Sequence, residues 1–303
     1  MRVLASDGIE ESGAQIVRDA GFEIDVKKFS ADELLTVIDQ YDAIIVRSAT
    51  KVTKEVIDKG TKLKVLARAG VGMDNLDLVY AKEKGIPVVN TPGASSISVA
   101  ELAIGHMFCV ARFLNVSNIE MRLGKWPKKE YAHGFELTGK TLGLLGFGNI
   151  GKEVAKRALG LGMAVIAHDP FITSTDMNIK LATKDELIQN ANIISLHIPF
   201  IKAEGPSVTA KEFAAMKKGV VIINCARGGV VSERDLLTAL NDGTVRYAGI
   251  DVFENEPTTE TQQELINHPR VSVTPHIGAS TDEAQDRVGI EIAQRVVEVL
   301  KKY

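Results

Sequence analysis

The sequence predicts an α/β protein with two doubly wound parallel-sheet domains. Short β-rich runs alternate with helical patterns, the alternation is interrupted once near the middle of the chain, and it then resumes. A chain of 303 residues, 45% of them hydrophobic, is long enough to form two cores.

The first half contains five predicted strands separated by helices. These strands are expected at Val3–Ala5, Ile24–Val26, Ala43–Val46, Val65–Ala67 and Val88–Val89. Helix starts are marked by caps, because Ser30 and Glu33 are spaced to satisfy each other's backbone amides. Strands that alternate with helices in this way form a parallel sheet covered on both faces.

The alternation is punctuated at Thr91–Gly93, after which residues 98–113 are predicted to form one long apolar helix. This helix is expected to connect the domains, to form a subunit interface or to be buried in the second domain. Residues 124–139 are predicted to be irregular. The second set of strands is expected at Thr141–Leu145, Ala164–His168, Ile193–Leu196, Val220–Ile223, Tyr247–Ile250 and Val271–Val273. A capping-box pattern at Ser280–Glu283 precedes a final helix, which we expect to pack on the first domain.

The strongest functional signal is a glycine turn between a strand and a helix. Gly146 permits the tight turn, Gly148 lets the backbone approach a pyrophosphate, and Gly151 lets the helix pack closely on the strand. The helix amides would face the phosphates. Asp169, 23 positions after Gly146, would accept hydrogen bonds from the ribose and repel a 2′-phosphate. The pattern therefore predicts NAD rather than NADP, the alternative being a glycine turn that binds nothing.

Composition disfavours several other partners. The net charge is −3 and no Lys/Arg tract is present, so neither nucleic acid nor an anionic membrane is favoured. The N-terminus reads as a strand rather than a signal peptide, and the apolar stretch Leu102–Ala111 is shorter than the ~20 residues of a membrane span. Cys109 and Cys225 form no disulfide framework, which suits a reducing cytoplasm. No residues have metal-ligand spacing, so no metal is expected.

Ligands bind parallel sheets beyond the carboxyl ends of the strands, so the residues found there are candidates. Arg227 precedes two glycines and could fork onto a carboxylate, or form a salt bridge within its domain. His276 is the histidine best placed for proton transfer, and Glu254 or Glu256 beside it would favour its protonated form; both acids could instead be surface carboxylates. His106, inside the apolar helix, is predicted to be a core residue.

In the first half, Arg47–Ser48 and Arg68 follow neighbouring strands and form a positive corner. An anionic group such as a phosphate would suit this corner, and pairing with nearby Asp or Glu is the alternative.

Four ordered motifs make the chain resemble the D-2-hydroxyacid dehydrogenases, and within them the phosphoglycerate dehydrogenases most closely. They are Gly146–Gly151, Asn224–Gly229, Asp251–Pro257 and Thr274–Ser280, and further matches make the resemblance cover essentially the whole chain. The resemblance implies a flavodoxin-like substrate domain, residues 1–92 plus 281–303, and a Rossmann-type NAD domain, residues 93–280, with a cleft between them.

The resemblance also implies roles for single residues. Arg227 would bind the substrate carboxylate, Glu256 rather than Glu254 would orient the histidine, and His276 would donate or accept the proton. Backbone amides at Val71 and Gly72 would also hold the carboxylate. Cofactor contacts are implied for Gly146, Gly148, Asn149, Ile150, Gly151, Asp169, His197, Pro199, Cys225, Ala226, Arg227, Asp251, His276 and Gly278. Phosphate contacts are implied for Arg47, Ser48 and Arg68, helped by Lys128–Lys129 of a neighbouring subunit.

The implied reaction is NAD-dependent oxidation of 3-phosphoglycerate to 3-phosphohydroxypyruvate, the first step of serine biosynthesis, by a cytoplasmic homodimer with the long helix at its interface. A glyoxylate or hydroxypyruvate reductase, or an NAD(H)-sensing protein similar to transcriptional corepressors, are the alternatives. Longer relatives add regulatory domains after the helix that ends here at Tyr303, so serine feedback is not expected. Residues 200–208 depart from the family's usual threonine-containing turn, which leaves the contacts of this loop open.

Overall fold

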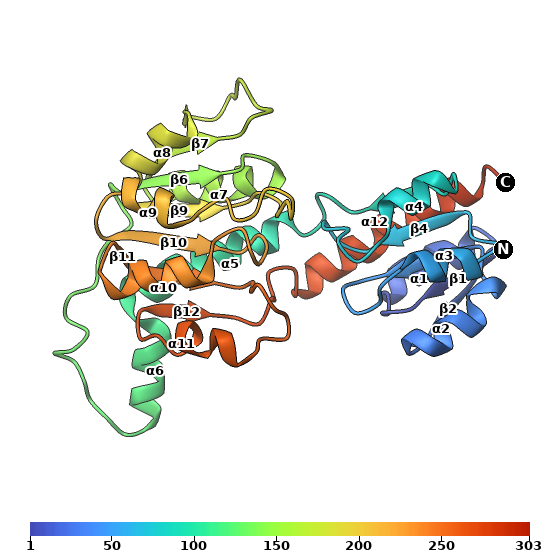
Figure 1. Cartoon of the computed structure of the whole chain (residues 1–303), viewed down its shortest axis with the longest axis horizontal. Coiled ribbons are helices and arrows are strands. Elements are labelled where there is room, and N and C mark those ends of the chain that lie inside the picture. The colour runs from blue at the N-terminus through green and yellow to red at the C-terminus, as the bar shows by residue number, and fades with distance from the viewer. The chain divides into compact units, whose positions relative to one another are not determined.

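The computed structural model describes all 303 residues and contains two compact units. Unit 1 comprises Met1–Ser96 and Ala279–Tyr303, and unit 2 comprises Ile97–Gly278. The expected breaks, after residues 92 and 280, differ from these boundaries by four and two residues. Each unit contains a parallel sheet with helices on both faces (Figure 1), which confirms the predicted α/β class.

Unit 1 is built on a five-stranded sheet of order β2-β1-β3-β4-β5. Its strands are β1 (Arg2–Ala5), β2 (Glu23–Val26), β3 (Ala43–Val46), β4 (Val65–Arg68) and β5 (Val88–Asn90). Helices α1 (Glu11–Asp19) and α12 (Asp282–Leu300) bury apolar residues such as Val17 and Ile292 on one face. The other face is covered by α2 (Ala31–Val37), the short η1 (Ile38–Gln40), α3 (Lys54–Lys59) and α4 (Leu78–Glu83).

The helix caps of unit 1 agree with the sequence in one case and differ in another. Ser30 and Glu33 form the expected capping box at the start of α2. At α12 the expected capping box over Ser280–Glu283 was wrong, because the N-cap is Thr281, whose side chain accepts from the amide of Ala284.

Unit 2 is built on a seven-stranded sheet of order β12-β11-β10-β9-β6-β7-β8. Its strands are β6 (Thr141–Leu145), β7 (Ala164–His168), β8 (Lys180–Leu181), β9 (Ile193–Leu196), β10 (Val220–Asn224), β11 (Val245–Ile250) and β12 (Val271–Val273). The strand order reverses between β6 and β9. In an open parallel sheet this reversal opens a crevice at the carboxyl ends of the two strands.

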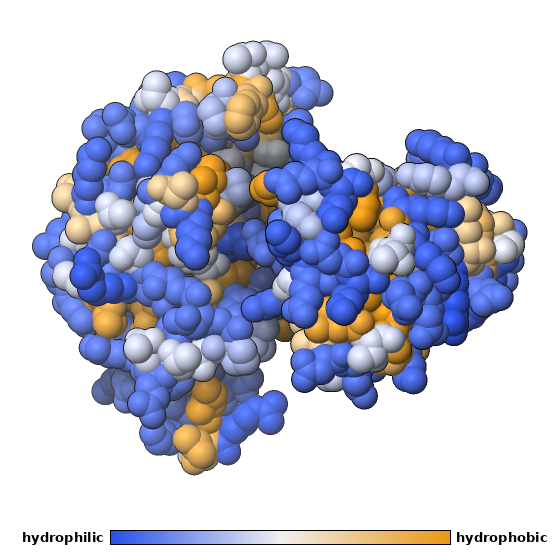
Figure 2. All heavy atoms as spheres, turned by 45° about the vertical axis from the view of Figure 1, so that its right-hand side comes forward, coloured by the Kyte–Doolittle hydropathy of each residue, from blue (hydrophilic) through white to orange (hydrophobic).

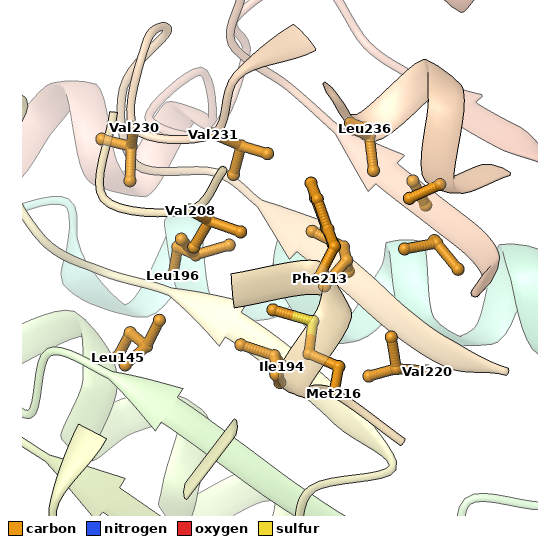
Figure 3. Close-up of a cluster of buried hydrophobic side chains, with 14 of the residues drawn as sticks. Leu145, Ile194, Leu196, Val208, Phe213, Met216, Val220, Val230, Val231 and Leu236 are labelled. Carbon is orange, nitrogen blue, oxygen red and sulfur yellow. The ribbon is translucent and has the colours of Figure 1, made fainter. Parts of the chain in front are cut away.

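Helices cover both faces of the second sheet. On one face α5 (Ser96–Arg112) and α7 (Asn149–Gly160) enclose an apolar cluster around Phe147 and Met107. On the other face lie α8 (Lys184–Asn190), α9 (Ala210–Ala215) and α10 (Glu233–Asn241). Figure 3 shows Phe213 and Met216 pointing among the aliphatic side chains of this second cluster. The remaining elements are α6 (Leu114–Arg122), η2 (Glu260–Gln262) and α11 (Gln263–Ile266).

Two elements were not predicted. The strand β8 has only two residues, too few for an alternating pattern to show. The long helix α5 ends at Arg112, since Phe113 adopts a left-handed conformation with φ of 57°, and α6 then starts in a new direction. Residues 124–139 contain no helix or strand, as expected.

No single helix combines the length and the apolar composition that a membrane span requires, although α5 and α6 pass this test as a pair bent by 64°. Hydrophilic residues cover most of the face shown in Figure 2. Among the exposed large apolar side chains are Leu114, Ile119 and Met121 of α6.

Candidate active site

The glycine turn joins β6 to α7 at the point where the strand order reverses. A Cβ on Gly146 would lie 2.4 Å from the carbonyl oxygen of His197, and a Cβ on Gly151 would lie 2.3 Å from that of Gly146. These two glycines are therefore required by packing within unit 2. A Cβ on Gly148 would meet nothing within 4 Å, and no side chain caps α7 there. Open space at an uncapped helix N-terminus suits a phosphate.

Asp169 is held at the glycine turn by backbone amides. Its Oδ2 accepts from the amide of Phe147 and its Oδ1 from that of Phe171, each at 2.9 Å. A carboxylate oxygen accepts more than one hydrogen bond, so both oxygens retain capacity for ribose hydroxyls. The carboxylate is thus oriented by the turn itself.

His197 follows β9 on the other side of the strand reversal. Its Nε2 lies 2.9 Å from Ser195 Oγ, whereas its buried Nδ1 has no hydrogen-bond partner. Burial lowers the pKa of His197 to about 4, so the imidazole is neutral at physiological pH. An orphaned buried nitrogen beside the glycine turn fits a polar group bound at this edge of the sheet. The contacts of Gly148, Asp169 and His197 with a dinucleotide stay predictions, and the geometry of all three is compatible with them.

We expect Asp169→Ala to weaken the discrimination between the two nicotinamide cofactors. Removing the carboxylate removes both the ribose acceptor and the repulsion of a 2′-phosphate, so the ratio of kcat/KM for NADH over NADPH should fall roughly tenfold or more. Steady-state kinetics with each cofactor measures this ratio. Asp176→Ala removes an acid from the loop that follows β7 and should leave the ratio unchanged; an unchanged ratio in Asp169→Ala would contradict the assignment.

His276 and Glu256 form a hydrogen-bonded couple. His276 Nδ1 lies 2.6 Å from Glu256 Oε2, and Glu256 Oε1 accepts from the amide of Phe253 at 3.0 Å. Burial alone would raise the pKa of Glu256, but the bonds from His276 and Phe253 and the nearby positive charges outweigh it, so the pKa is lowered. The two side chains retain 43% and 37% exposure, so the imidazole is accessible within unit 2.

Glu254, the other acid of the Asp251–Pro257 motif, contacts Glu233 and not His276. Glu254 accepts from the amide of Glu233 at 3.1 Å, and its own amide donates to the Glu233 carboxylate at 2.6 Å. Of the two acids left open by spacing, the structure therefore brings Glu256, and not Glu254, to His276.

The turn that carries His276 is fixed by Asp251. The carbonyl of Asp251 accepts from the amide of His276 at 2.8 Å, and its buried carboxylate accepts from the amides of Ile277 and Gly278 at 2.8 and 2.9 Å. His276 itself has a φ of 54°, a conformation that residues other than glycine rarely adopt. Asp251 thus holds the histidine in an unfavourable backbone geometry, and its expected contact with the nicotinamide stays a prediction.

Arg227 lies in the loop after β10, close to this couple. A Cβ on Gly228 would come within 1.8 Å of the carbonyl oxygen of Phe253, so only glycine lets this loop lie against the Glu256 segment. One Nη1–H of Arg227 donates to the carbonyl of Ala226 at 2.7 Å. The positive charge of Arg227 contributes to the lowered pKa of Glu256, which indicates proximity. Unit 2 therefore assembles Arg227, Glu256 and His276.

The loop that departs from the family pattern packs on the Arg227 loop. The ring of Phe200 lies against Gly229, whose φ is 79°. Phe200 therefore occupies the space that a side chain at position 229 would need. The cofactor contacts of this loop, including the one expected at Pro199, stay predictions.

Cys225 directly follows β10 and is buried. Burial, followed by the charge of Asp251, raises the pKa of Cys225, so its thiol stays neutral and acts as a small apolar neighbour. A cavity of about 380 Å³ lies beside the couple and is lined by residues that include Phe253, Ile266 and Pro275. Neither Arg227 nor the glycine turn lines this cavity, so it is not the dinucleotide site.

The expected phosphate residues of unit 1 are engaged by their own unit. Arg47 Nη2 lies 2.5 Å from Glu10 Oε2, and Arg68 Nη1 donates to the carbonyl of Ala69. Ser48 is exposed. The amides of Val71 and Gly72, proposed to hold the substrate carboxylate, donate to no backbone carbonyl.

Two polar contacts behind the His276 turn could not be predicted from the spacing of residues along the sequence. Ser98 Oγ donates to the carbonyl of Gly278 at 2.6 Å, and His106, expected in the core, is hydrogen-bonded to Ser272 and Thr274. Both side chains come from α5, more than 160 residues away in sequence. The only available signal was that polar residues interrupt an otherwise apolar helix.

These features define the class as a dinucleotide-binding α/β oxidoreductase. Residues 104–278 match the family model of the D-isomer-specific 2-hydroxyacid dehydrogenase NAD-binding domain. The chain belongs to this family: it is an NAD-dependent D-2-hydroxyacid dehydrogenase that acts on a small-molecule 2-hydroxyacid substrate, and its cofactor is NAD.

Individual relatives support the assignment. The chain is 46% identical to hydroxypyruvate reductase of Thermotoga maritima, covering 99% of this chain and 98% of that protein. It is 42% identical to D-3-phosphoglycerate dehydrogenase of Methanocaldococcus jannaschii, covering 99% of this chain but only 58% of that protein. A crystal structure of a Thermus thermophilus protein superposes with a TM-score of 0.91 at 32% identity, covering 100% of this chain and 97% of that one.

Proposed function

We propose that this protein reduces a small unphosphorylated 2-oxo acid, with hydroxypyruvate as the preferred substrate and NADH as the electron donor. The observation that carries the choice is the ion pair of 2.5 Å between Arg47 and Glu10. Arg47 is one of the two arginines expected to bind a substrate phosphate, and a carboxylate already neutralises its charge. A substrate without a phosphate needs no such cation.

The relatives favour the same substrate. The hydroxypyruvate reductase of Thermotoga maritima matches over nearly its whole length, whereas the chain spans 58% of the phosphoglycerate dehydrogenase of Methanocaldococcus jannaschii. A crystal structure of a glyoxylate reductase from Paecilomyes thermophila superposes with a TM-score of 0.89 at 30% identity. Both of these relatives are named as reductases of a small 2-oxo acid, which supports this substrate class.

In the proposed mechanism Arg227 forks onto the substrate carboxylate and polarises the neighbouring carbonyl. Bound NADH supplies the hydride. Glu256 accepts a hydrogen bond from His276 Nδ1–H, so Nε2 is the nitrogen directed at the substrate oxygen. In reduction His276 starts protonated and donates from Nε2; in oxidation it starts neutral and accepts the hydroxyl proton there.

We also propose that the active form is a homodimer with α5 and α6 at its interface. Ile97 and Phe108 of α5 are 42% and 37% exposed, and Leu114 and Ile119 of α6 are 51% and 59% exposed. Apolar side chains gathered on adjoining helices are typical of a subunit interface. The contribution of the exposed Lys128–Lys129 to a neighbouring subunit's substrate stays a prediction.

A second candidate is the oxidation of 3-phosphoglycerate. Phosphoglycerate dehydrogenases from a plant and from animals are 42–44% identical to this chain. Arg47 follows β3, and Arg68 is the last residue of the adjacent strand β4. This candidate requires the phosphate of 3-phosphoglycerate to displace the Glu10 carboxylate from Arg47.

Comparing kcat/KM for hydroxypyruvate with that for 3-phosphohydroxypyruvate, both with NADH, tests the proposal. We expect hydroxypyruvate to be preferred by roughly tenfold or more, because Glu10 already neutralises the charge of Arg47. Preference for the phosphorylated substrate would overturn this choice.

A matched pair of variants isolates the ion pair. Glu10→Gln removes the partner of Arg47 and should raise kcat/KM for the phosphorylated substrate, whereas Glu11→Gln, which affects only the ion pair with Arg18, should not.

A further inference from the structure

A buried histidine in α5 is linked to the His276 turn by a chain of hydrogen bonds. His106 is 2% exposed and packs on β11, where a Cβ on Gly249 would lie 2.6 Å from the His106 Cβ. Its Nε2 lies 3.0 Å from Thr274 Oγ1, which in turn donates to Asp251 Oδ1 at 2.6 Å. Asp251 is the residue that fixes the His276 turn, so the chain runs from the helix to the proton-transfer group.

The protons in this chain have one consistent arrangement. The hydroxyl of Thr274 has a single hydrogen, which it donates to Asp251, so it accepts from His106 Nε2–H. Burial, opposed by the charge of Asp251, lowers the pKa of His106, so the imidazole is neutral and carries only this N–H. Its Nδ1 is then an acceptor for the hydroxyl of Ser272 at 3.0 Å. No member of the chain is left without a partner.

We infer that His106, acting through Thr274 and Asp251, is a positioning residue for His276. The inference rests on the proposed function, in which His276 transfers the proton. His276 has a φ of 54°, which is unfavourable for a residue with a Cβ, so its surroundings must hold it there. The helix α5 does so on both sides of the turn, through His106 at Thr274 and through Ser98 at the carbonyl of Gly278.

The central test compares Thr274→Val with Thr274→Ser. Valine has nearly the shape of threonine but no hydroxyl, so Asp251 loses a donor and His106 loses an acceptor, whereas serine keeps both bonds. We expect Thr274→Val to lower kcat for hydroxypyruvate roughly tenfold, since a displacement of less than 1 Å at a reacting group already has large effects. The KM for NADH should stay within about twofold, and Thr274→Ser should recover kcat to within about threefold.

A second pair of variants replaces His106. His106→Gln places a side-chain amide near the position of Nε2 and can still donate to Thr274, whereas His106→Leu cannot. We expect kcat to fall in the leucine variant and to be largely retained in the glutamine variant. Ser272→Ala is the matched control, because it removes the other partner of His106; it should lower Tm while leaving kcat unchanged.

His276→Gln, measured in parallel, separates the proposed proton transfer by His276 from the proposed positioning role of His106. Wild-type kcat in His276→Gln would overturn the proposed role of His276. A large loss in His276→Gln together with wild-type kcat in Thr274→Val would overturn the positioning role alone. A loss in Ser272→Ala equal to that in Thr274→Val would also overturn it, since a general packing defect would then explain both. If His106→Leu does not fold, the comparison of Thr274→Val with Thr274→Ser decides whether the positioning role holds.

Discussion

Replacing His276 with glutamine is expected to lower kcat about 10³-fold, equivalent to roughly 4 kcal/mol of transition-state stabilisation. Glutamine can still hydrogen-bond to Glu256 but cannot donate and recover a proton at the substrate oxygen. The measurement is single-turnover reduction of hydroxypyruvate by NADH, which isolates the chemical step from product release. The Kd for NADH should change much less than kcat, because the glycine turn and Asp169 are unchanged. A rate within tenfold of the wild type would exclude proton transfer by His276.

The two acids of the same motif provide an internal control. Glu256→Gln keeps the bond from the Phe253 amide but replaces the acceptor of His276 Nδ1–H by an amide group, so kcat should fall roughly 10²-fold. Glu254→Gln alters only the contact with Glu233 and should leave kcat within about twofold. Equal losses in the two variants would show that the motif acts through folding rather than through His276.

Replacing Arg227 with alanine is expected to have the second-largest effect, a loss of about 3–4 kcal/mol, or 10²–10³-fold, in kcat/KM for the 2-oxo acid. A charge-assisted, two-bonded contact to the substrate carboxylate is lost, together with polarisation of the carbonyl. The effect should fall on kcat as well as on the KM for the 2-oxo acid, and much less on the Kd for NADH. An unchanged kcat/KM would remove Arg227 from the mechanism.

Two further variants show whether geometry or charge is responsible. Arg227→Lys keeps the positive charge but not the planar fork, and should recover only part of the lost activity. Arg234→Ala removes an exposed cation paired with Asp235 in α10 and should have no measurable effect on kcat/KM.

The alternation of strands and helices was readable from local patterns because each element buries its own apolar residues. Strands such as Ala43–Val46 and Ile193–Leu196 appear at the expected residues. A short continuous run of aliphatic side chains is typical of a parallel strand that is buried on both faces. The two-residue strand β8 and the bend at Phe113 were missed. The strand β8 depends on its pairing with β7, and the bend depends on the single unusual backbone angle of Phe113. Neither feature leaves a periodic pattern in the sequence.

The glycine turn was also predictable from the sequence. Gly146 and Gly151 are required by contacts with residues brought close by the same strand–turn–helix unit or by the adjacent strand. Asp169 lies at the end of the next strand, so its place beside the turn follows from the pairing of β6 with β7. Local connectivity therefore sufficed to predict the glycine turn and the position of its acid.

The sequence by itself determined the α/β class and the glycine turn with its acid, and it predicted which residue types would bind a carboxylate and transfer a proton. The tertiary structure decided which acid contacts His276, that Glu10 neutralises Arg47, and that His106 of α5 is linked to the turn after β12. The physical reason is that these contacts join segments distant in the chain. Spacing along the sequence fixes side-chain direction within an element, whereas distances between elements depend on how close glycines such as Gly228 and Gly249 allow the backbones to approach.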